Sequence, residues 1–201
     1  MANTSAKWKS VLLILTFVIT EYFLQGSIET LGDYAIYIGE LILVILFFVI
    51  FNDHELQPAK PDKNGFALLS SLLVMGFLSR ALAGTMGIII PFDFHSTETL
   101  IFLLAVGPLL EELLFRGLLH RTFQELLENT VATSVITSLM FSYSHFQAYF
   151  KVPADFQPFI FYQTGYTFLL ALLCTIVRIR HGLIWAILAH ALFNFGFYLG
   201  N

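Results

Sequence analysis

The sequence predicts an all-α membrane protein, a polytopic bundle of six to eight transmembrane helices that encloses a polar intramembrane cavity. Three observations favour this fold class. Of the 201 residues, 57% are hydrophobic and 12% are charged, whereas about a quarter of a typical soluble domain is charged. Apolar runs close to the roughly 20 residues that a bilayer-spanning helix needs follow one another with short polar gaps. Ionisable residues nevertheless lie inside several runs, where lipid would normally exclude them.

The first two apolar runs, 11–24 and 34–51, are predicted to span the membrane. Two lysines precede the first run, as in a signal peptide. No Ala-x-Ala cleavage site follows, however, and Glu21 interrupts the run, so we interpret it as a retained span. A polar segment with two prolines, 52–64, separates these runs from the third.

The third run covers 66–90, and Pro91 begins an outer turn. The fourth run, 100–116, begins as a purely apolar stretch. It is followed by an amphipathic stretch, 117–128, which we expect to project from the membrane. The remaining runs cover 131–149, 158–177 and 183–199. Because no internal repeat or soluble linker separates the runs, residues 1–201 are interpreted as a single transmembrane domain.

The positions of Lys and Arg predict a cytoplasmic N-terminus, because cytoplasmic loops are enriched in these residues. The basic residues on or near that face are then Lys7, Lys9, Lys60, Lys63, Arg116, Arg121, Arg178 and Arg180, with Lys151 outside. Trp8 and Trp185 fall at the inner boundary, and His120 and His181 on this side are expected to be solvated. Basic residues so scattered form no patch for nucleic acid. The apolar runs make membrane lipid the expected partner.

Two adjacent glutamates, Glu111 and Glu112, lie in the fourth run within the sequence GPLLEELLFR. Glu112 and Arg116 are four residues apart with the acid first, which is the favourable order for an ion pair on a helix. Glu111 points about 100° away, because a helix has 3.6 residues per turn. We therefore interpret Glu112 as the structural partner of Arg116 and Glu111 as the reactive carboxylate. Pro108 deprives the carbonyl of Leu104 of its helical donor and is expected to kink the helix.

Two histidines and an asparagine are predicted to lie at the same depth as Glu111. His145 lies late in the fifth run, and His190 and Asn194 are four residues apart on one face of the seventh. Counted at 1.5 Å per residue from the turn between the fourth and fifth helices, Glu112 and His145 lie about equally far along the hairpin. The alternative is that the histidines are hydrogen-bonded core residues and the charged residues form a purely structural cluster.

This set of residues suits peptide hydrolysis, which needs an activated water, a group that takes and returns a proton, and donors for the oxyanion. A glutamate beside a histidine can polarise the water, while His190 and Asn194 can donate to the oxyanion. A zinc site with His145, His190 and Glu111 as ligands is equally compatible, and the sequence leaves both open. The H-E-x-x-H and Gly-x-Ser-x-Gly patterns are absent, and Cys174 is expected to lie away from this level.

Three short motifs resemble those of a known family. They are EELLFR at 111–116, FSYSH at 141–145 and HALFN at 190–194. In this order, inside successive helices, they resemble the motifs of the CPBP family of intramembrane glutamic or metallo endopeptidases. This family includes CAAX prenyl endopeptidases and the bacteriocin-processing or self-immunity proteins once called Abi. The resemblance covers about 100–200, which we expect to be the catalytic core.

The resemblance implies a role for each polar residue. Glu111 and His145 would activate the water, His190 and Asn194 would stabilise the oxyanion, and Glu112 and Arg116 would support the site. The family is called metalloprotease, yet a metal-free glutamate mechanism has been argued for it. One divalent metal such as zinc, held by Glu111, His145 and His190, therefore stays open as a cofactor. Family members often have eight spans.

The expected function is intramembrane proteolysis of a membrane-associated peptide or protein, lipidated substrates included, near the cytoplasmic leaflet of a prokaryotic plasma membrane. A proton-coupled transporter is one alternative, because buried Glu and His chains also serve as proton relays. Such transporters usually contain two repeated halves, and no repeat is found here. A non-catalytic membrane immunity or scaffold protein that keeps the motifs as fold elements is the other alternative. Peptide cleavage that is lost in Glu111→Ala would distinguish the protease from both.

Overall fold

In the computed structural model, residues 4–23, 35–51 and 62–201 are described, and all regular elements among them are helices. The predicted all-α class is therefore confirmed. The longer helices are α1 (Thr4–Phe23), α3 (Ala35–Phe51), α4 (Lys63–Thr85), α8 (Thr130–Phe146), α9 (Gln157–His181) and α10 (Leu183–Leu199).

A continuous helical run, called the central run below, lies between α4 and α8. It consists of α5 (Thr97–Ile101), the π-helix η2 (Phe102–Val106), α6 (Gly107–Glu112), the π-helix η3 (Leu113–Leu119) and α7 (His120–Leu127). Two 3-10 turns, η4 (Gln147–Phe150) and η5 (Ala154–Phe156), join α8 to α9.

Two helices end earlier than the apolar runs that predicted them. The third run, expected over 66–90, ends as α4 at Thr85, where Gly87 takes a positive φ of 68°. The N–H of Gly87 donates to Gly84 and the following N–H reaches back to Ala83, a pairing that closes a helix and favours glycine at this position. The fifth run was expected to reach 149, but the α-helix α8 ends at Phe146. The 3-10 turn η4 takes the place of the last predicted turn.

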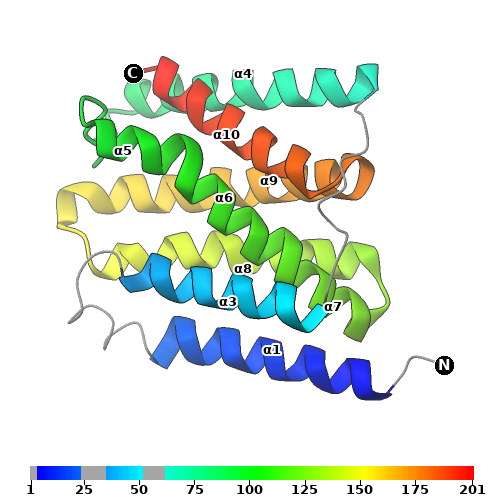
Figure 1. The fold of residues 1–201 in the computed structure, drawn as a ribbon. Coiled ribbons are helices and arrows are strands. Elements are labelled where there is room, and N and C mark those ends of the chain that lie inside the picture. Colours follow the sequence, from blue (N-terminus) through cyan, green and yellow to red (C-terminus); the bar gives the residue numbers. More distant parts are fainter. Residues whose placement is uncertain (1–3, 24–34, 52–61) are drawn as a thin grey trace.

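The helices pack as a bundle that the central run crosses obliquely (Figure 1). α4 and α10 pack together on one side, and α8 and α9 pack against each other. On the opposite side, α1 contacts α7 and α3 contacts η3. Because the three motifs lie on the central run, α8 and α10, this arrangement gathers them in the middle of the bundle.

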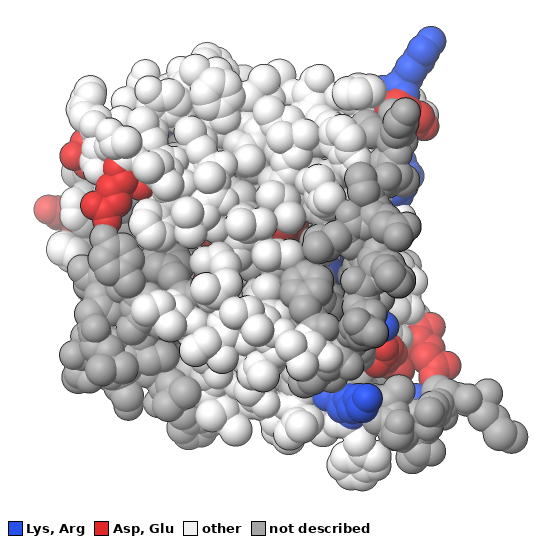
Figure 2. All heavy atoms as spheres, viewed as in Figure 1, with Lys and Arg blue, Asp and Glu red and all other residues white. Residues whose placement is uncertain are grey.

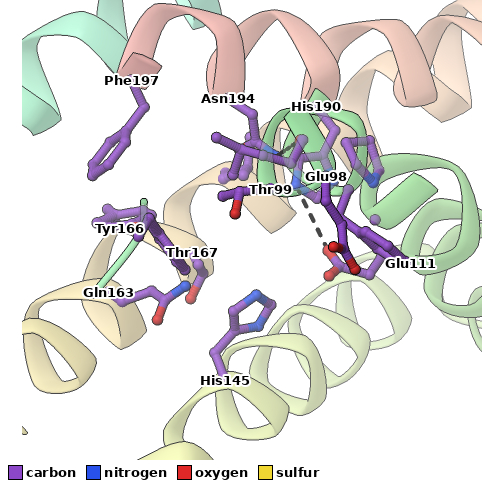
Figure 3. A pocket seen from close by; sticks show the side chains of 16 residues that line it. Glu98, Thr99, Glu111, His145, Gln163, Tyr166, Thr167, His190, Asn194 and Phe197 are labelled. Atoms are coloured by element: carbon purple, nitrogen blue, oxygen red, sulfur yellow. Dashed lines mark hydrogen bonds and ion pairs between the residues drawn. The ribbon is translucent and has the colours of Figure 1, made fainter. Parts of the chain in front are cut away.

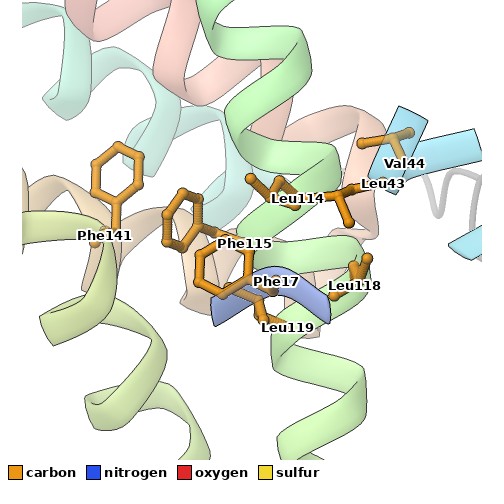
Figure 4. Close-up of a cluster of buried hydrophobic side chains, with 9 residues drawn as sticks. Phe17, Leu43, Val44, Leu114, Phe115, Leu118, Leu119 and Phe141 are labelled. Carbon is orange, nitrogen blue, oxygen red and sulfur yellow. The ribbon is translucent and has the colours of Figure 1, made fainter. Parts of the chain in front are cut away.

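A buried apolar cluster attaches the two N-terminal helices to the central run (Figure 4). Phe17 of α1 meets Phe115 of η3 edge to face, with ring centroids 6.0 Å apart. Leu43 and Val44 of α3 complete this side of the cluster. The other members are Leu114, Leu118, Leu119, Phe141 and Ala171. The segment that follows the two glutamates is therefore held in place by α1 and α3.

Two glycines allow α4 and α10 to cross with their backbones in contact. A Cβ atom added to Gly76 would collide with the carbonyl oxygen of Phe193, and one added to Gly196 would collide with that of Leu73. Gly200, one turn after Gly196, faces α4 as well. Small residues permit such close approach between membrane helices. The Gly-x-x-x-Gly pattern at 196–200 is the sequence signal for this contact.

One face of the molecule is largely uncharged between two charged ends (Figure 2). Figure 2 shows a broad uncharged face, with charged residues gathered near its two ends. Large apolar side chains such as Val49, Val131 and Phe161 are exposed on different helices. Soluble monomers rarely expose contiguous apolar surface of this extent, so the surface favours a membrane environment.

Among the described residues, two helical segments are long and apolar enough to span a membrane, Lys63–Thr85 and Ala154–His181. The helices α3, α8 and α10 each have 17 residues, about 25 Å at 1.5 Å per residue. That is shorter than the roughly 30 Å hydrocarbon core. The six to eight spans expected from the sequence are therefore not confirmed as a number.

Candidate active site

The two glutamates lie on α6, between two π-helical segments. At the end of η2, the N–H of Gly107 donates to the carbonyl of Phe102, five residues back. In this register, the carbonyl that Pro108 leaves without a donor is that of Leu103, one residue earlier than an α-helix predicts. Asn194 of α10 satisfies it, because its Nδ2 donates to the Leu103 oxygen at 2.7 Å. The proline thus leaves a carbonyl acceptor free, and α10 binds the central run through a hydrogen bond to it.

Glu112 is the centre of a buried charge network. Its side chain is fully buried, and its Oε1 lies 3.0 Å from Arg116 Nη1, in the ion pair expected from the helical spacing. The same oxygen accepts a 2.9 Å hydrogen bond from His190 Nδ1. The Arg116 guanidinium lies over the ring of Phe141, 4.5 Å from its centroid. Glu112 therefore orients His190 as well as neutralising Arg116, a contact that spacing within one helix did not reveal.

Glu111 faces the other way and lines a cavity. Its side chain is 28% exposed, while that of Glu112 is 0% exposed. Glu111 Oε2 lies 3.7 Å from His190 Nε2, which is too long for a hydrogen bond. His190 therefore stands between two carboxylates, with Nδ1 bonded to Glu112 and Nε2 directed at Glu111. The adjacent glutamates thus occupy different surroundings, one closed and one open.

His145 reaches the cavity from the last turn of α8. Its Nδ1 lies 2.9 Å from the carbonyl oxygen of Phe141. Because a carbonyl can only accept, Nδ1 carries a proton, and a neutral ring then offers Nε2 as an acceptor. The Phe141 ring packs against both histidines, with centroids 4.7 Å from His145 and 5.8 Å from His190. Sequence reasoning missed this role of Phe141, although its four-residue spacing from His145 in FSYSH was a signal for it.

The candidate residues line one cavity of about 520 Å³ (Figure 3). The structure brings together Glu111, His145, His190 and Asn194 on its wall, whereas Glu112 and Arg116 lie behind the wall. The rest of the polar lining was not predicted from the sequence, and it consists of Glu98, Thr99, Gln163, Tyr166 and Thr167. The last three share one face of α9 through their spacing, which could have indicated them.

The cavity extends toward the end of the bundle that carries α5. Its wall includes Phe92 and Glu98, in and beside the turn expected on the outer side. α4 begins at Lys63 and the last turn of α9 contains Arg178. This start of α4 and this end of α9 lie at the other end of the bundle from α5 (Figure 1). The cavity therefore extends away from the end of the bundle that carries these two basic residues.

The two histidines and Glu111 do not fit a three-ligand metal site as they are arranged. Among the residues that the structure describes, no group of three His, Cys, Asp or Glu side chains could hold a metal ion. His190 Nδ1 is bonded to Glu112 and His145 Nδ1 to the Phe141 carbonyl, so only the Nε2 atom of each histidine is left as a possible ligand. We therefore assign no catalytic step to a metal.

Three residues lie in surroundings that the sequence did not predict. Cys174 is fully buried with its thiol next to the Glu112 carboxylate, so it lies at the level of the site rather than away from it. His120 and His181, expected to be solvated, are 1% and 8% exposed. His120 is covered because α7 packs against α8 and α1 instead of projecting freely. Burial, with the charges of Arg178 and Arg116, lowers the pKa of His120 to about 4.

Comparisons with known proteins place the motifs in one family. The family model described as type II CAAX prenyl endopeptidase Rce1-like matches residues 93–196, just over half of the chain. The matched stretch contains the whole central run, α8, α9 and most of α10, with all three motifs. No curated protein and no solved structure matches the chain.

Proposed function

Since the chain belongs to the Rce1-like family of type II CAAX prenyl endopeptidases, we propose that it is a CAAX-protease-like intramembrane endopeptidase. It hydrolyses a peptide bond of a membrane-associated peptide or protein, lipidated substrates included. The observation that carries this proposal is the cavity in an apolar bundle, where Glu111 is open to solvent and His190 joins it to a buried ion pair. Proteins of this family are membrane proteins.

Glu111 and His145 activate the water. The Glu111 carboxylate is open to the cavity, and the Nε2 of His145 is the acceptor that its backbone hydrogen bond leaves available. A water between them donates one hydrogen bond to each. Glu111 takes a proton as the water oxygen attacks the carbonyl carbon, and gives it to the leaving amine when the C–N bond breaks.

His190 and Asn194 hold the oxyanion. With a proton on each ring nitrogen, His190 donates to Glu112 through Nδ1 and to the oxyanion through Nε2. Asn194 donates one N–H to the carbonyl of Leu103 and keeps a second for the oxyanion. Donors held in place in this way stabilise the charge that develops in the transition state.

The cavity also suits an apolar substrate group. Phe92, Phe102 and Phe197 contribute aromatic surface to its wall, beside the polar side chains. A prenyl chain or an apolar peptide side chain would pack against these rings while the peptide bond lies between Glu111 and His190. We further propose a multi-pass protein of a prokaryotic plasma membrane with its N-terminus in the cytoplasm. Residues 1–201 form one domain, with the catalytic core at about 100–200.

Cleavage by the purified protein tests the function. Full-length protein in liposomes is given a farnesylated peptide that ends in a CAAX sequence, with a fluorophore and a quencher on either side of the bond. We expect cleavage by the wild type and a loss of about 100-fold or more in Glu111→Gln, with an unchanged melting temperature. Glu125→Gln is the matched control, because Glu125 pairs with Arg121 and lies outside the cavity.

Each alternative gives a different result. Cleavage that persists in Glu111→Gln would contradict the assigned mechanism. Peptide or proton uptake into the liposomes without cleavage would indicate a transporter. A folded wild type that neither cleaves nor transports would indicate a scaffold or immunity protein.

A further inference from the structure

A second cavity lies at the basic end of the bundle, away from the candidate active site. It has a volume of about 420 Å³ and lies where α9 turns into α10, beside the turn from α7 to α8. Its lining consists of His120, Gln124, Thr130, Arg178, Ile179, Gly182 and Leu183. No acidic side chain of the described part of the chain lines it, and the nearby Glu125 and Glu128 are paired with Arg121 and Lys7. The cavity therefore favours negative charge.

One donor on its wall lacks an acceptor. Arg178 Nη1 lies 3.1 Å from His120 Nδ1. Because a guanidinium can only donate, this ring nitrogen carries no proton, and the neutral ring holds its proton on Nε2. The Nε2 atom is buried and has no hydrogen-bond partner in the structure, and the His120 side chain is 1% exposed. A buried N–H without an acceptor is destabilising, so a ligand oxygen here would be favourable.

The first turn of α10 adds backbone donors to the same cavity. No side chain caps this helix, and its first backbone bond runs from Ala186 N–H to the carbonyl of Gly182 at 3.3 Å. The N–H groups of residues 183–185 have no acceptor within the helix. Because Gly182 and Leu183 line the cavity, the positive end of the helix dipole lies beside it.

We propose that this cavity binds a phosphate group. The Arg178 guanidinium, His120 Nε2–H and the first-turn N–H groups of α10 donate to its oxygens. Gln124 Oε1, a buried acceptor without a partner, suits a hydroxyl of a phosphatidylglycerol headgroup or of protonated phosphate. The headgroup of an anionic phospholipid and free inorganic phosphate share this chemistry. Trp185 next to the cavity is of a type enriched at membrane interfaces, where headgroups lie.

Two measurements on the full-length protein test the site and separate the sources. Binding of free phosphate is measured as the rise in melting temperature in sodium phosphate, compared with sodium chloride at the same ionic strength. Native mass spectrometry after extraction from vesicles of phosphatidylcholine and phosphatidylglycerol reports retained lipid. Arg178→Gln should weaken binding by about tenfold or more. The matched control Arg180→Gln removes the same charge from an exposed position outside the lining, and should change binding less than about twofold.

A second variant keeps the test decisive if Arg178→Gln does not fold. Ile184 is exposed in the first turn of α10, where a carboxylate stabilises the helix and competes for its donors. Ile184→Glu should fold as well as the wild type and lose binding. Phosphate binding without lipid retention assigns the site to free phosphate, and retained phosphatidylglycerol assigns it to a headgroup. Equal binding by Arg178→Gln and Arg180→Gln, undiminished binding by Ile184→Glu, or no binding of either probe overturns the proposal.

Discussion

Glu112 shares one carboxylate oxygen between Arg116 and His190, so a single residue links the stability of the site to the orientation of its histidine. An acid that only neutralised Arg116 would be needed for folding alone. An acid that also holds His190 is needed for the proposed catalysis as well. Substitutions at this position should therefore affect melting temperature and cleavage rate separately.

Glu112→Gln is expected to leave the buried Arg116 without a counter-charge, which costs about 3–5 kcal/mol, and to slow cleavage. The double variant Glu112→Gln with Arg116→Met should recover part of the stability, because neither charge is then left alone. It should not recover the cleavage rate, because His190 still lacks its anionic partner. Thermal melting and peptide cleavage of both variants measure the two effects. A wild-type melting temperature in Glu112→Gln would show that the pair contributes no stability.

His120 makes the folded state sensitive to acid. Its pKa is lowered from 6.5 to about 4 in the folded protein, so between these values the unfolded chain binds more protons. The free energy of unfolding therefore falls as the pH is lowered from 6.5 to 4, by on the order of 3 kcal/mol. His120→Gln should remove this part of the pH dependence. Melting curves at pH 7.5 and 4.5 in buffers without phosphate test it, and equal pH dependence in both proteins would exclude His120 as the cause.

At the scale of the elements, Pro108 and Asn194 form a complementary pair: one removes a donor from the central run and the other supplies it from α10. Asn194→Ala should leave the Leu103 carbonyl unsatisfied, at a cost of about 1–3 kcal/mol. Adding Pro108→Ala supplies the missing N–H and should restore much of that stability without restoring activity. A double-mutant cycle of melting temperatures measures the coupling. Additive effects would mean that the two residues act independently.

The crossing of α4 and α10 depends on the absence of side chains at Gly76 and Gly196. Gly76→Ala and Gly196→Ala should each lower stability by at least about 1–3 kcal/mol, because backbone atoms must move apart. Cleavage should fall as well, since α10 carries His190 and Asn194. Gly165→Ala in α9 is the control, because a Cβ there meets nothing within 4 Å. If Gly76→Ala and Gly196→Ala are as stable as Gly165→Ala, the two helices are packed less closely than the structure indicates.

Periodicity within one helix was enough to predict the helices, the Glu112–Arg116 pair and the opposite directions of the two glutamates, because these depend on 3.6 residues per turn alone. The His190–Glu112 bond and the partner of Asn194 depend on how two distant segments meet. In the π-helical register, the carbonyl without a donor is that of Leu103 instead of Leu104. Helix propensities of the residues give no sign of this shift. His120 was misjudged for a related reason, since the helix that carries it is covered by neighbours that are remote in sequence.

At the scale of the whole molecule, an uncharged surface lies between charged ends, and the cavity extends toward only one of them. Thr97 and Asn64 are exposed near opposite ends, at the starts of α5 and α4. With a cytoplasmic N-terminus, a membrane-impermeant maleimide should label Thr97→Cys in intact cells and Asn64→Cys only after permeabilisation. The wild type is the control, because its single cysteine, Cys174, is fully buried. The reverse pattern would invert the orientation.

The two sides of the active-site cavity differ in how firmly they are held. α10 is fixed against α4 at a crossing with no space for a methyl group. On the other side, α5 and η2 contain no buried residue, and local stability is lowest where few contacts are buried. A substrate should therefore enter beside Glu98 by displacing α5. The chain would turn near Leu103, where the hydrogen bond from Asn194 holds it. Each peptide would then meet the two proposed oxyanion donors, His190 and Asn194, in fixed positions. The opposite wall alone would move to fit peptides of different size.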